Sequence, residues 1–498
     1  MTASARPVER VVIVGGGTAG WMAAAAAALF LHDGRRTITL VESDAIGTVG
    51  VGEATIPPIV NFNRLLGIDE NEFLAATGGT YKLGIEFVGW SDRAARYFHP
   101  FGTFGRDISG IAFHQLWLKL RARDGIGPIE DYSMSAVAAR AGRFAHPAAD
   151  PRDPLSTLSY AYHFDAGRYA AFLRARAEAG GVARVEGRIA TVERDRESGH
   201  VAAVLLDDGR RVEGELFIDC SGFRSLLLGE TMGVPFENWS HWLPCDRAVA
   251  VPTERSGPLL PYTRSTARDA GWQWRIPLQH RTGNGLVYST AHMTDAEAER
   301  VLMAGLDAPN TADPSALSFT AGRRVRQWEG NVVALGLAGG FLEPLESTSI
   351  HLIQAGISKL FSLFPDRRFT AIERDTFNRL MGDAYVGVRD FIILHYHAAG
   401  RRETPFWRYV TGMAIPDSLA DKVALFREKG RIFRYDDELF AVPNWVAVML
   451  GQDVMPDGYD PVADALDDDR VAAALRQMRA GIAATAARMP PHAGALGS

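Results

Sequence analysis

Three glycines near the N-terminus are the residues of this chain whose spacing most plainly suggests chemistry. In the segment VVIVGGGTAGWMAAAAAALF, Gly15, Gly17 and Gly20 follow the pattern G-x-G-x-x-G. The pattern comes directly after an apolar, β-branched run and opens an alanine-rich run, which is the context in which such a loop binds a dinucleotide. The first glycine permits a tight turn, the second lets a pyrophosphate approach the backbone, and the third lets a helix pack on a strand.

A carboxylate further along the chain agrees with this interpretation. Glu42 ends a second β-rich run, 22 residues after Gly20, where it can accept hydrogen bonds from the hydroxyls of an adenosine ribose. An acidic residue at this point disfavours NADP, because it would repel the 2′-phosphate. The loop and Glu42 therefore predict a site for FAD or NAD, and the alternative is an ordinary turn between a strand and a helix.

The elements that must position this loop can be read from hydrophobic periodicity. We expect a strand over residues 11–14, a helix over 18–31 and a strand over 37–42, which together form a βαβ unit. Residues 216–220 and 332–335 are short apolar runs before glycine turns, as is typical of buried parallel strands. From about residue 352 the pattern becomes mostly helical. The sequence thus predicts an α/β fold with α+β elaborations and a helical C-terminal part.

Composition limits the classes of protein to which the chain can belong. The 498 residues are 47% hydrophobic and 22% charged, as in a globular enzyme, and the net charge of −6 with scattered basic residues argues against a nucleic-acid partner. Cys220 and Cys245 are too few for a disulfide framework and are not spaced as a metal site. The longest apolar run, residues 21–31, is too short to cross a bilayer. We expect a soluble cytoplasmic protein with neither membrane nor metal.

Lys82 is a candidate whose ordinary interpretation is structural. It precedes Leu83, Ile85 and Phe87, which alternate with other residues like a strand with one buried face. A lysine beside such a face is most often a solvated surface charge. On residue type alone, Lys82 is therefore expected at the surface.

Glu346 and the segment WQWRIP at 272–277 also have ordinary interpretations. Glu346 stands just before a helix expected to begin near Ser347 or Thr348, where a carboxylate can simply interact with the helix dipole. Trp272 and Trp274 alternate as in a core strand with an aromatic face.

Several segments together, however, resemble the flavin-dependent tryptophan halogenases across most of the chain. They are GGGTAGWMAA at 15–24, VGVGEATIPP at 49–58, TYKLGIEFVGW at 80–90, FHPFG at 98–102, LFIDCSGFRSLL at 216–227, WQWRIP at 272–277 and FLEPLESTSI at 341–350. The resemblance implies FAD rather than NAD, with FADH2 supplied by a separate flavin reductase and a chloride or bromide ion as co-substrate. It also implies halogenation of an electron-rich aromatic molecule, such as indole, an indole derivative or tryptophan.

The resemblance assigns roles to the candidate catalytic residues. Lys82 stands at the place of the family's essential lysine, which receives hypohalous acid and offers electrophilic halogen to the ring. Glu346 corresponds to the catalytic glutamate, which helps to orient the halogenating species or takes the ring proton. The backbone amides of Thr348 and Ser349 correspond to the halide site, since helix N-termini bind anions. The family commonly has glycine where this chain has Ser349, which puts the local geometry and the halide preference in question.

The resemblance also indicates which residues line the cofactor and substrate sites. For FAD they are Gly15, Gly17, Thr18, Ala19, Gly20, Glu42, Ala54, Thr55, Ile189, Leu337 and Ile350. Trp272, Trp274, Ile276 and Pro277 form a motif of the class that keeps organic substrate away from the flavin.

On the substrate side, His99 and Phe101 match positions that sandwich an indole ring, although either could be structural. Trp445 stands in Asn444-Trp445-Val446, where tryptophan-using members carry Asn-Tyr-Tyr. Without those hydroxyls the carboxylate of free tryptophan loses polar partners, so indole or a larger aromatic molecule is at least as well suited.

The resemblance suggests a division of the chain and leaves two rival functions. An FAD-binding, Rossmann-like core would comprise residues 8–100, 155–250 and 325–360, interleaved with a substrate-binding sheet part at 101–154 and 251–324. Residues 361–490 would form helices that close the substrate pocket, and 491–498 a flexible tail. An aromatic monooxygenase is disfavoured because Gly336-Leu-Ala lacks the Asp that such enzymes usually carry there. A non-catalytic flavin-binding redox sensor is the other alternative.

Overall fold

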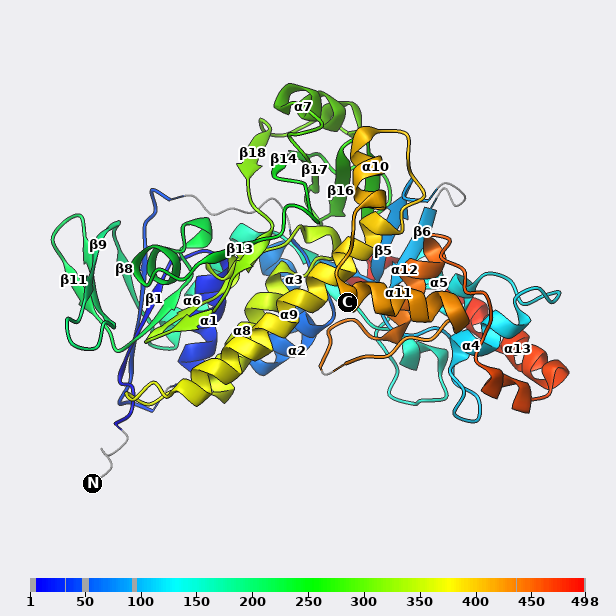
Figure 1. Ribbon diagram of the computed structural model, residues 1–498, viewed down its shortest axis with the longest axis horizontal. Coiled ribbons are helices and arrows are strands. Elements are labelled where there is room, and N and C mark those ends of the chain that lie inside the picture. Colours follow the sequence, from blue (N-terminus) through cyan, green and yellow to red (C-terminus); the bar gives the residue numbers. More distant parts are fainter. Residues whose placement is uncertain (1–5, 32, 47–52, 92–95, 436, 497–498) are drawn as a thin grey trace.

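The computed structural model describes residues 6–496 except for 32, 47–52, 92–95 and 436. The first four residues of the family-like stretch VGVGEATIPP lie outside the described residues. One part of the molecule carries β1, α1 and α6, another carries α4, α5 and α13, and the long helix α9 runs between them (Figure 1).

A six-stranded sheet forms the core of the first part, in the order β20-β21-β12-β1-β2-β8. Its strands are β1 Arg10–Val14, β2 Thr37–Glu42, β8 Ala183–Glu186, β12 Leu216–Asp219, β20 Trp328–Glu329 and β21 Val332–Ala334. All neighbours pair in parallel except β20 and β21. This confirms the predicted βαβ unit and both predicted parallel strands. Helix α1, Thr18–Phe30, joins β1 to β2 and packs against α6, Ala166–Ala179.

Two of the loop glycines are required by the close approach of backbone to backbone. Gly15 has a φ of +107°, and a Cβ on it would lie 2.3 Å from the carbonyl oxygen of Cys220. A Cβ on Gly20 would lie 1.8 Å from the carbonyl oxygen of Gly15. Only glycine lets the turn close onto β12 and lets α1 pack on the strand before it.

A seven-stranded sheet forms the second layer, in the order β18-β14-β17-β16-β15-β5-β6. Its strands are β5 Gly84–Val88, β6 Arg96–Pro100, β14 Arg247–Thr253, β15 Thr263–Arg268, β16 Gly271–Pro277, β17 Thr282–Tyr288 and β18 Ser315–Ser318. The segment WQWRIP is thus an interior strand. Strands β5 and β6 pair in this sheet. The predicted division of the chain, which assigned residues 8–100 to the FAD core, stays a prediction.

Three small sheets connect these layers, in the orders β3-β7-β4, β11-β10-β9 and β13-β19-β22. Their strands are β3 Glu53–Ala54, β4 Thr80–Lys82, β7 Ala161–Phe164, β9 Ile189–Arg194, β10 Val201–Leu206, β11 Arg211–Glu213, β13 Phe236–Asn238, β19 Gly322–Arg324 and β22 Gly340–Phe341. The helices between them are α2 Pro58–Leu65, α3 Glu70–Thr77, α4 Phe113–Leu120, α5 Met134–Arg140 and α7 Asp295–Ala304.

The C-terminal part is helical, as the sequence predicts. Its helices are α8 Ser349–Ser362, α9 Ala371–His397, α10 Pro405–Gly412, α11 Asp417–Lys429, α12 Val442–Gly451 and α13 Asp468–Arg488. Helix α9 packs against α8, α10 and α11. Across the described ranges, no helix has both the length and the apolar character that a membrane crossing requires.

Within the segment expected to form a flexible tail, the described residues His492–Leu496 pack against the core. Residues His492–Leu496 form the short helix η8, and His492 is fully buried. Its Nε2 accepts a hydrogen bond from the backbone N–H of Tyr81 at 3.2 Å, and its Nδ1 donates to the carbonyl of Leu259 at 2.9 Å. Two hydrogen bonds and burial fix a segment whose composition is typical of a loose terminus.

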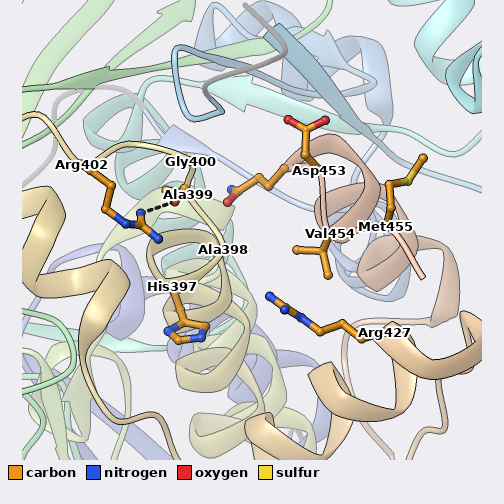
Figure 2. Close-up of a pocket in the computed structure, with 10 residues that line it drawn as sticks. His397, Ala398, Ala399, Gly400, Arg402, Arg427, Asp453, Val454 and Met455 are labelled. Atoms are coloured by element: carbon orange, nitrogen blue, oxygen red, sulfur yellow. Dashed lines mark hydrogen bonds between the residues drawn. The ribbon is translucent and has the colours of Figure 1, made fainter. Parts of the chain in front are cut away.

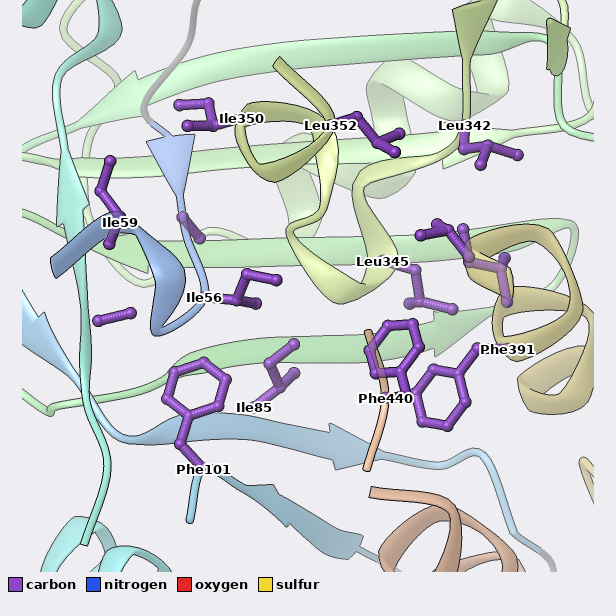
Figure 3. Packing of buried hydrophobic residues seen from close by; sticks show 14 of the residues in the cluster. Ile56, Ile59, Ile85, Phe101, Leu342, Leu345, Ile350, Leu352, Phe391 and Phe440 are labelled. Carbon is purple, nitrogen blue, oxygen red and sulfur yellow. The ribbon is translucent and has the colours of Figure 1, made fainter. Parts of the chain in front are cut away.

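A continuous hydrophobic cluster ties the layers together where the site lies (Figure 3). Ile85 of β5 and Phe101, just after β6, lie on one side of Leu345, and Phe391 of α9 and Phe440 lie beside it. Phe391 and Phe440 are stacked with ring centroids 3.8 Å apart. The loop before α8 is therefore held between the sheet and the C-terminal helices.

Candidate active site

A large cavity opens beside the glycine loop, where the carboxyl ends of β1 and β2 meet the start of α8. Its volume is about 730 Å³. The predicted FAD residues that line it are Gly15, Gly17, Thr18, Ala19, Glu42, Ala54, Ile189, Leu337 and Ile350. Parallel α/β sheets bind their ligands at this end of the strands. The structure therefore brings these nine predicted residues together around one space.

Two predicted FAD residues do not line this cavity. Gly20 is buried against the turn, where it lets α1 pack closely. Thr55 is buried, and its side chain donates a hydrogen bond to the carbonyl of Tyr162 at 2.7 Å, while its own carbonyl faces Lys82. These two residues shape the site without facing the cavity.

The cavity fits a dinucleotide. A Cβ on Gly17 would meet nothing within 4 Å, so backbone there faces open space at the start of α1. Glu42 lines the cavity with its Oε1 2.5 Å from Nε of Arg184, which fixes the carboxylate at the far end of β2. The volume lies within the range of cofactor pockets, roughly 300–1,000 Å³. Loop, carboxylate and volume are those that FAD requires.

The WQWRIP strand forms one wall of this cavity. Trp272, Trp274 and Ile276 line it, and Pro277 instead accepts a hydrogen bond from Oγ1 of Thr80 at 2.8 Å. Trp272 donates from Nε1 to Oε2 of Glu343 at 2.9 Å. The strand therefore connects the wall of the cavity to β4, which carries Lys82.

Lys82 is fully buried, so the surface position expected from residue type alone is wrong. Its Nζ donates hydrogen bonds to the carbonyl of Thr55 at 3.0 Å and to Oγ of Ser347 at 2.8 Å. Burial lowers the pKa of the Lys82 ammonium to about 7, although the charge of Glu346 acts in the opposite direction. The lysine can therefore both donate hydrogen bonds and lose its proton near neutral pH.

Glu346 is fully buried as well, at the end of the short helix η6, Pro344–Glu346. Nδ1 of His99 lies 3.0 Å from its Oε1, and Nε2 of His395 lies 2.7 Å from the same oxygen. Burial alone would raise the pKa of Glu346, but its contacts with His99 and His395 outweigh burial and lower the pKa to about 2. Glu346 is thus an ionised carboxylate in a dry place.

Ser347 links the two catalytic candidates. It has a φ of 59°, in the left-handed region that a serine rarely adopts, and its hydroxyl faces Lys82. Strained backbone of this kind is common at functional sites. The turn between η6 and α8 therefore presents Glu346 and the hydroxyl of Ser347 together.

The predicted halide site lies at the next two residues. Helix α8 begins at Ser349 with Thr348 as its N-cap, close to the predicted start. Ser349 lines the flavin cavity, while Thr348 is fully buried. Amides of a first helical turn have no acceptor within the helix, so this helix start can bind an anion beside the cofactor.

The predicted substrate residues lie around Lys82 and Glu346. The ring centroid of Phe101 is 5.3 Å from Nζ of Lys82. His99 uses both ring nitrogens, with Glu346 on one side and Nδ2 of Asn444 at 3.0 Å on the other. Trp445 follows Asn444 and is buried, edge-on to Phe391 with centroids 4.9 Å apart.

Sequence reasoning missed His395, Asn444 as a partner of His99, and Ser347 as a partner of Lys82. His395 lies within the apolar run FIILHYH of α9, where no spacing connects it with Glu346. Ser347 stood in the motif, but only the backbone conformation shows that it turns toward β4.

A second cavity, of about 450 Å³, is lined by the end of α9, by Arg427 of α11 and by the residues after α12 (Figure 2). His397, Arg402 and Arg427 lie around the same space in Figure 2. It shares no lining residue with the flavin cavity. The predicted site residues therefore line the larger cavity or belong to the buried cluster around Lys82 and Glu346.

A dinucleotide cavity with a buried lysine and a buried carboxylate close to it is the arrangement of an enzyme that uses a dinucleotide cofactor. Comparison with known proteins agrees. The tryptophan halogenase family matches residues 10–468. The chain belongs to this family of flavin-dependent halogenases, which use reduced FAD and a halide to halogenate aromatic molecules.

Relatives resemble the chain over nearly its whole length. Tryptophan 6-halogenase SttH of Streptomyces toxytricini is 36% identical over 475 residues, which cover 90% of each chain. Among solved structures, Xcc4156, a flavin-dependent halogenase from Xanthomonas campestris, has a TM-score of 0.94 at 51% identity, covering 99% of this chain and 98% of that one. BrvH, a flavin-dependent halogenase from Brevundimonas sp. BAL3, has a TM-score of 0.94 at 48% identity, covering 98% of both.

Proposed function

We propose that this halogenase acts on an indole or an indole derivative, with Lys82 and Glu346 as its catalytic residues. The observation that supports this most strongly is the burial of both side chains next to the flavin cavity, where Ser347, the residue after Glu346, accepts a hydrogen bond from Lys82 and lines that cavity. Bound FADH2, with O2 and a halide, supplies hypohalous acid. The chain's own residues then determine where that reagent goes.

Lys82 receives the hypohalous acid through its Nζ, which Thr55 and Ser347 hold in place. Glu346 takes the proton that the ring loses when halogen adds, and its low pKa keeps it ionised for this role. The backbone amides of Thr348 and Ser349 hold the halide. FAD occupies the cavity beside the glycine loop, with the residues predicted for it.

His99, Phe101 and Trp445 bound the place of the aromatic substrate. Phe101 offers a ring face next to Lys82, and His99 is fixed by Glu346 and Asn444. Position 445 carries a buried indole without a hydroxyl, which suits a substrate that lacks an amino-acid carboxylate. Free tryptophan is the second candidate substrate, because the name of the SttH relative includes it.

A separate flavin reductase supplies FADH2 in this proposal, and the protein works in the cytoplasm, where its two free cysteines stay reduced. The test combines protein, FAD, a flavin reductase, NADH and either chloride or bromide with indole, tryptophan and phenols. Mass spectrometry should show the isotope pattern of the halogen, with more product from indole than from tryptophan. Products that carry oxygen without halogen would contradict the assignment, and NADH oxidation without added reductase would contradict the separate reductase.

A further inference from the structure

Glu346 lies between two histidines that come from different parts of the fold, His99 from β6 and His395 from α9. Within the described ranges, this is the only group of three or more His, Cys, Asp or Glu residues whose potential metal-ligating atoms all lie within 4.8 Å of one another. Each side chain is at most 2% exposed. Water therefore cannot share the charge of the carboxylate, and the protons on the two imidazoles determine how it is balanced.

The hydrogen bonds around His99 show that it is neutral. The Oδ1 of Asn444 accepts a hydrogen bond from the backbone N–H of Ala441 at 2.8 Å, so the amide nitrogen of Asn444 must face His99. That nitrogen donates to Nε2 of His99 at 3.0 Å. Because Nε2 accepts, the single proton of His99 lies on Nδ1 and is donated to Glu346.

The surroundings of His395 require a different state. Its Nδ1 lies 2.7 Å from the carbonyl oxygen of Phe391, which can only accept, so Nδ1 carries a proton. In a neutral ring, Nε2 would then hold a lone pair facing Oε1 of Glu346 at 2.7 Å. Two lone pairs at that distance in a dry site repel each other, whereas a proton on Nε2 turns the contact into an ion pair.

A metal ion between the two atoms fits this geometry less well than a proton does. Zinc bonds of about 2.0–2.1 Å at tetrahedral angles separate neighbouring ligand atoms by roughly 3.3 Å. The 2.7 Å between Nε2 of His395 and Oε1 of Glu346 is instead the distance of a charge-assisted contact.

We propose that His395 carries a proton on both ring nitrogens and acts as a positioning residue whose positive charge keeps Glu346 ionised inside the closed site. This inference rests on the proposed role of Glu346. When the halogenated ring loses its proton, the C–H bond breaks, its electron pair restores the aromatic system, and the proton goes to the carboxylate. Oε2 of Glu346 takes it, since Nε2 of His395 contacts the other oxygen, Oε1, and within the described part of the chain Oε2 has only Nδ1 of His99 beside it, at 3.0 Å.

The other groups facing Glu346 cannot replace this charge. From β4 comes Lys82, whose pKa burial lowers to about 7. From β6 comes His99, which is neutral because its Nε2 accepts a hydrogen bond from Asn444. The same strand contributes Tyr97, and burial raises the pKa of its hydroxyl far above the ordinary value. Helix α12 contributes the neutral Asn444, and β5 contributes the ring of Phe87, 4.9 Å from that of His395. His395 is therefore the charge that stays in place when Lys82 loses its proton.

A matched pair of variants tests the proposal. His395→Gln keeps a neutral donor at the place of Nε2, and His99→Asn keeps a neutral donor at the place of Nδ1. The first measurement is nitrogen NMR of the FAD-loaded protein with its 13 histidines isotopically labelled, at pH 8, where ordinary histidines are neutral. We expect one imidazolium signal pair that persists in His99→Asn and vanishes in His395→Gln. Glu346→Gln should abolish it too, which covers the case in which His395→Gln does not fold.

Absence of any such signal in the wild type at pH 8 would overturn the proposal. So would a signal that emerges only after treatment with EDTA, since it would mean that a metal ion had been in that place. These readouts do not depend on turnover. If the wild type shows the signal but produces no halogenated product, the proposed function fails and the proton assignment stands.

The second measurement is the pH profile of halogenation. Without the imidazolium, Glu346 should take up a proton at higher pH, so the acid limb of His395→Gln should move upward by at least one pH unit. The rate of His395→Gln relative to wild type should therefore be lowest at the acid end of the profile and should rise as pH increases. The acid limb of His99→Asn should stay at the wild-type position, because that variant removes no charge. Equal shifts in both variants would contradict the distinction between the two histidines.

Discussion

The ammonium of Lys82 donates a 2.8 Å hydrogen bond to the hydroxyl of Ser347, and Ser347 is the residue directly after Glu346. The left-handed backbone of Ser347 turns its side chain toward β4, while Glu346 points toward His99 and His395. One turn of backbone thus fixes the position of the lysine relative to the carboxylate. The same turn leads into α8, whose first residue lines the flavin cavity.

Removing the hydroxyl of Ser347 should slow halogenation. In Ser347→Ala the ammonium of Lys82 keeps only the carbonyl of Thr55, and a hydrogen bond to a charged group contributes roughly 1.5–3 kcal/mol. We expect kcat to fall about tenfold or more, since 1.4 kcal/mol corresponds to a factor of ten. Ser362→Ala is the control, because the hydroxyl of Ser362 lies exposed at the far end of α8 and donates to the carbonyl of Ser358. Equal loss in both variants would show that the Lys82 contact is not responsible.

Replacing Lys82 itself should abolish halogenation. Lys82→Met keeps a long apolar chain in the buried position but offers no donor to the hypohalous acid, and we expect a loss of at least roughly 100-fold. FAD binding, measured by flavin fluorescence, should stay at the wild-type value, because Lys82 does not line the flavin cavity. Lys359→Met on α8 controls for loss of a lysine elsewhere. A Lys82→Met variant that halogenates at the wild-type rate would remove this residue from the mechanism.

Local patterns could predict the cofactor half of the site. Gly20 is required by a contact within the βαβ unit and Gly15 by the end of the neighbouring strand β12, and strand β1, helix α1 and strand β2 begin and end within one residue of the expected ranges. Local patterns could not predict the buried cluster around Lys82 and Glu346, because these two residues are 264 positions apart in the sequence and come together only in the folded chain. Residue type placed Lys82 at the surface, and only the family resemblance placed it in the site.

The histidines show the same limit more strongly. His395 stands in the apolar run FIILHYH at the end of α9, where a histidine is usually a satisfied core group. Nothing in its spacing along the sequence points to Glu346. The proton on its Nδ1 follows from the contact with the carbonyl of Phe391, which only the three-dimensional structure shows. The terminal helix η8 escaped prediction for a related reason, since glycine and alanine after Pro490 carry no periodicity and the burial of His492 depends on distant strands.

Trp272 and Trp274 should differ in their effect on stability. Trp272 donates a hydrogen bond to the buried Glu343, whereas Nε1 of Trp274 has no partner within the described ranges. Trp272→Phe leaves Glu343 with the hydroxyl of Tyr396, 2.6 Å away, as its remaining donor. Losing a hydrogen bond to a buried carboxyl costs about 1–3 kcal/mol. We therefore expect Trp272→Phe to lower the free energy of unfolding by that much more than Trp274→Phe.

The difference should also depend on pH. Burial raises the pKa of Glu343 from 4.5 to about 7, against the hydrogen bonds of Tyr396 and Trp272. Between those values the folded protein binds more protons than the unfolded chain, so stability falls as pH rises. Without Trp272 to support the ionised form, the fall should be larger, and the gap between the two variants should be wider at pH 8 than at pH 5. Urea unfolding at both pH values measures it, and a gap independent of pH would contradict the role given to Glu343.

His492 should contribute stability that is lost in acid. Its hydrogen bonds hold the backbone of Tyr81, next to Lys82, and the carbonyl of Leu259. His492→Ala leaves the N–H of Tyr81 buried without an acceptor, which costs about 1–3 kcal/mol in the free energy of unfolding. His241→Ala, at an exposed histidine, is the control and should change stability little.

The pH dependence gives this prediction its sign. Burial lowers the pKa of His492 to about 4, although its bond to Leu259 acts in the opposite direction, so the unfolded chain binds more protons than the folded protein between about pH 6.5 and 4. The contribution of His492 is complete above pH 6.5 and declines as pH falls through this interval. The destabilisation caused by His492→Ala, measured by urea unfolding, should therefore be smaller at pH 5 than at pH 7.5. A destabilisation that stays constant or grows toward pH 5 would show that the histidine is not held neutral against Tyr81 and Leu259.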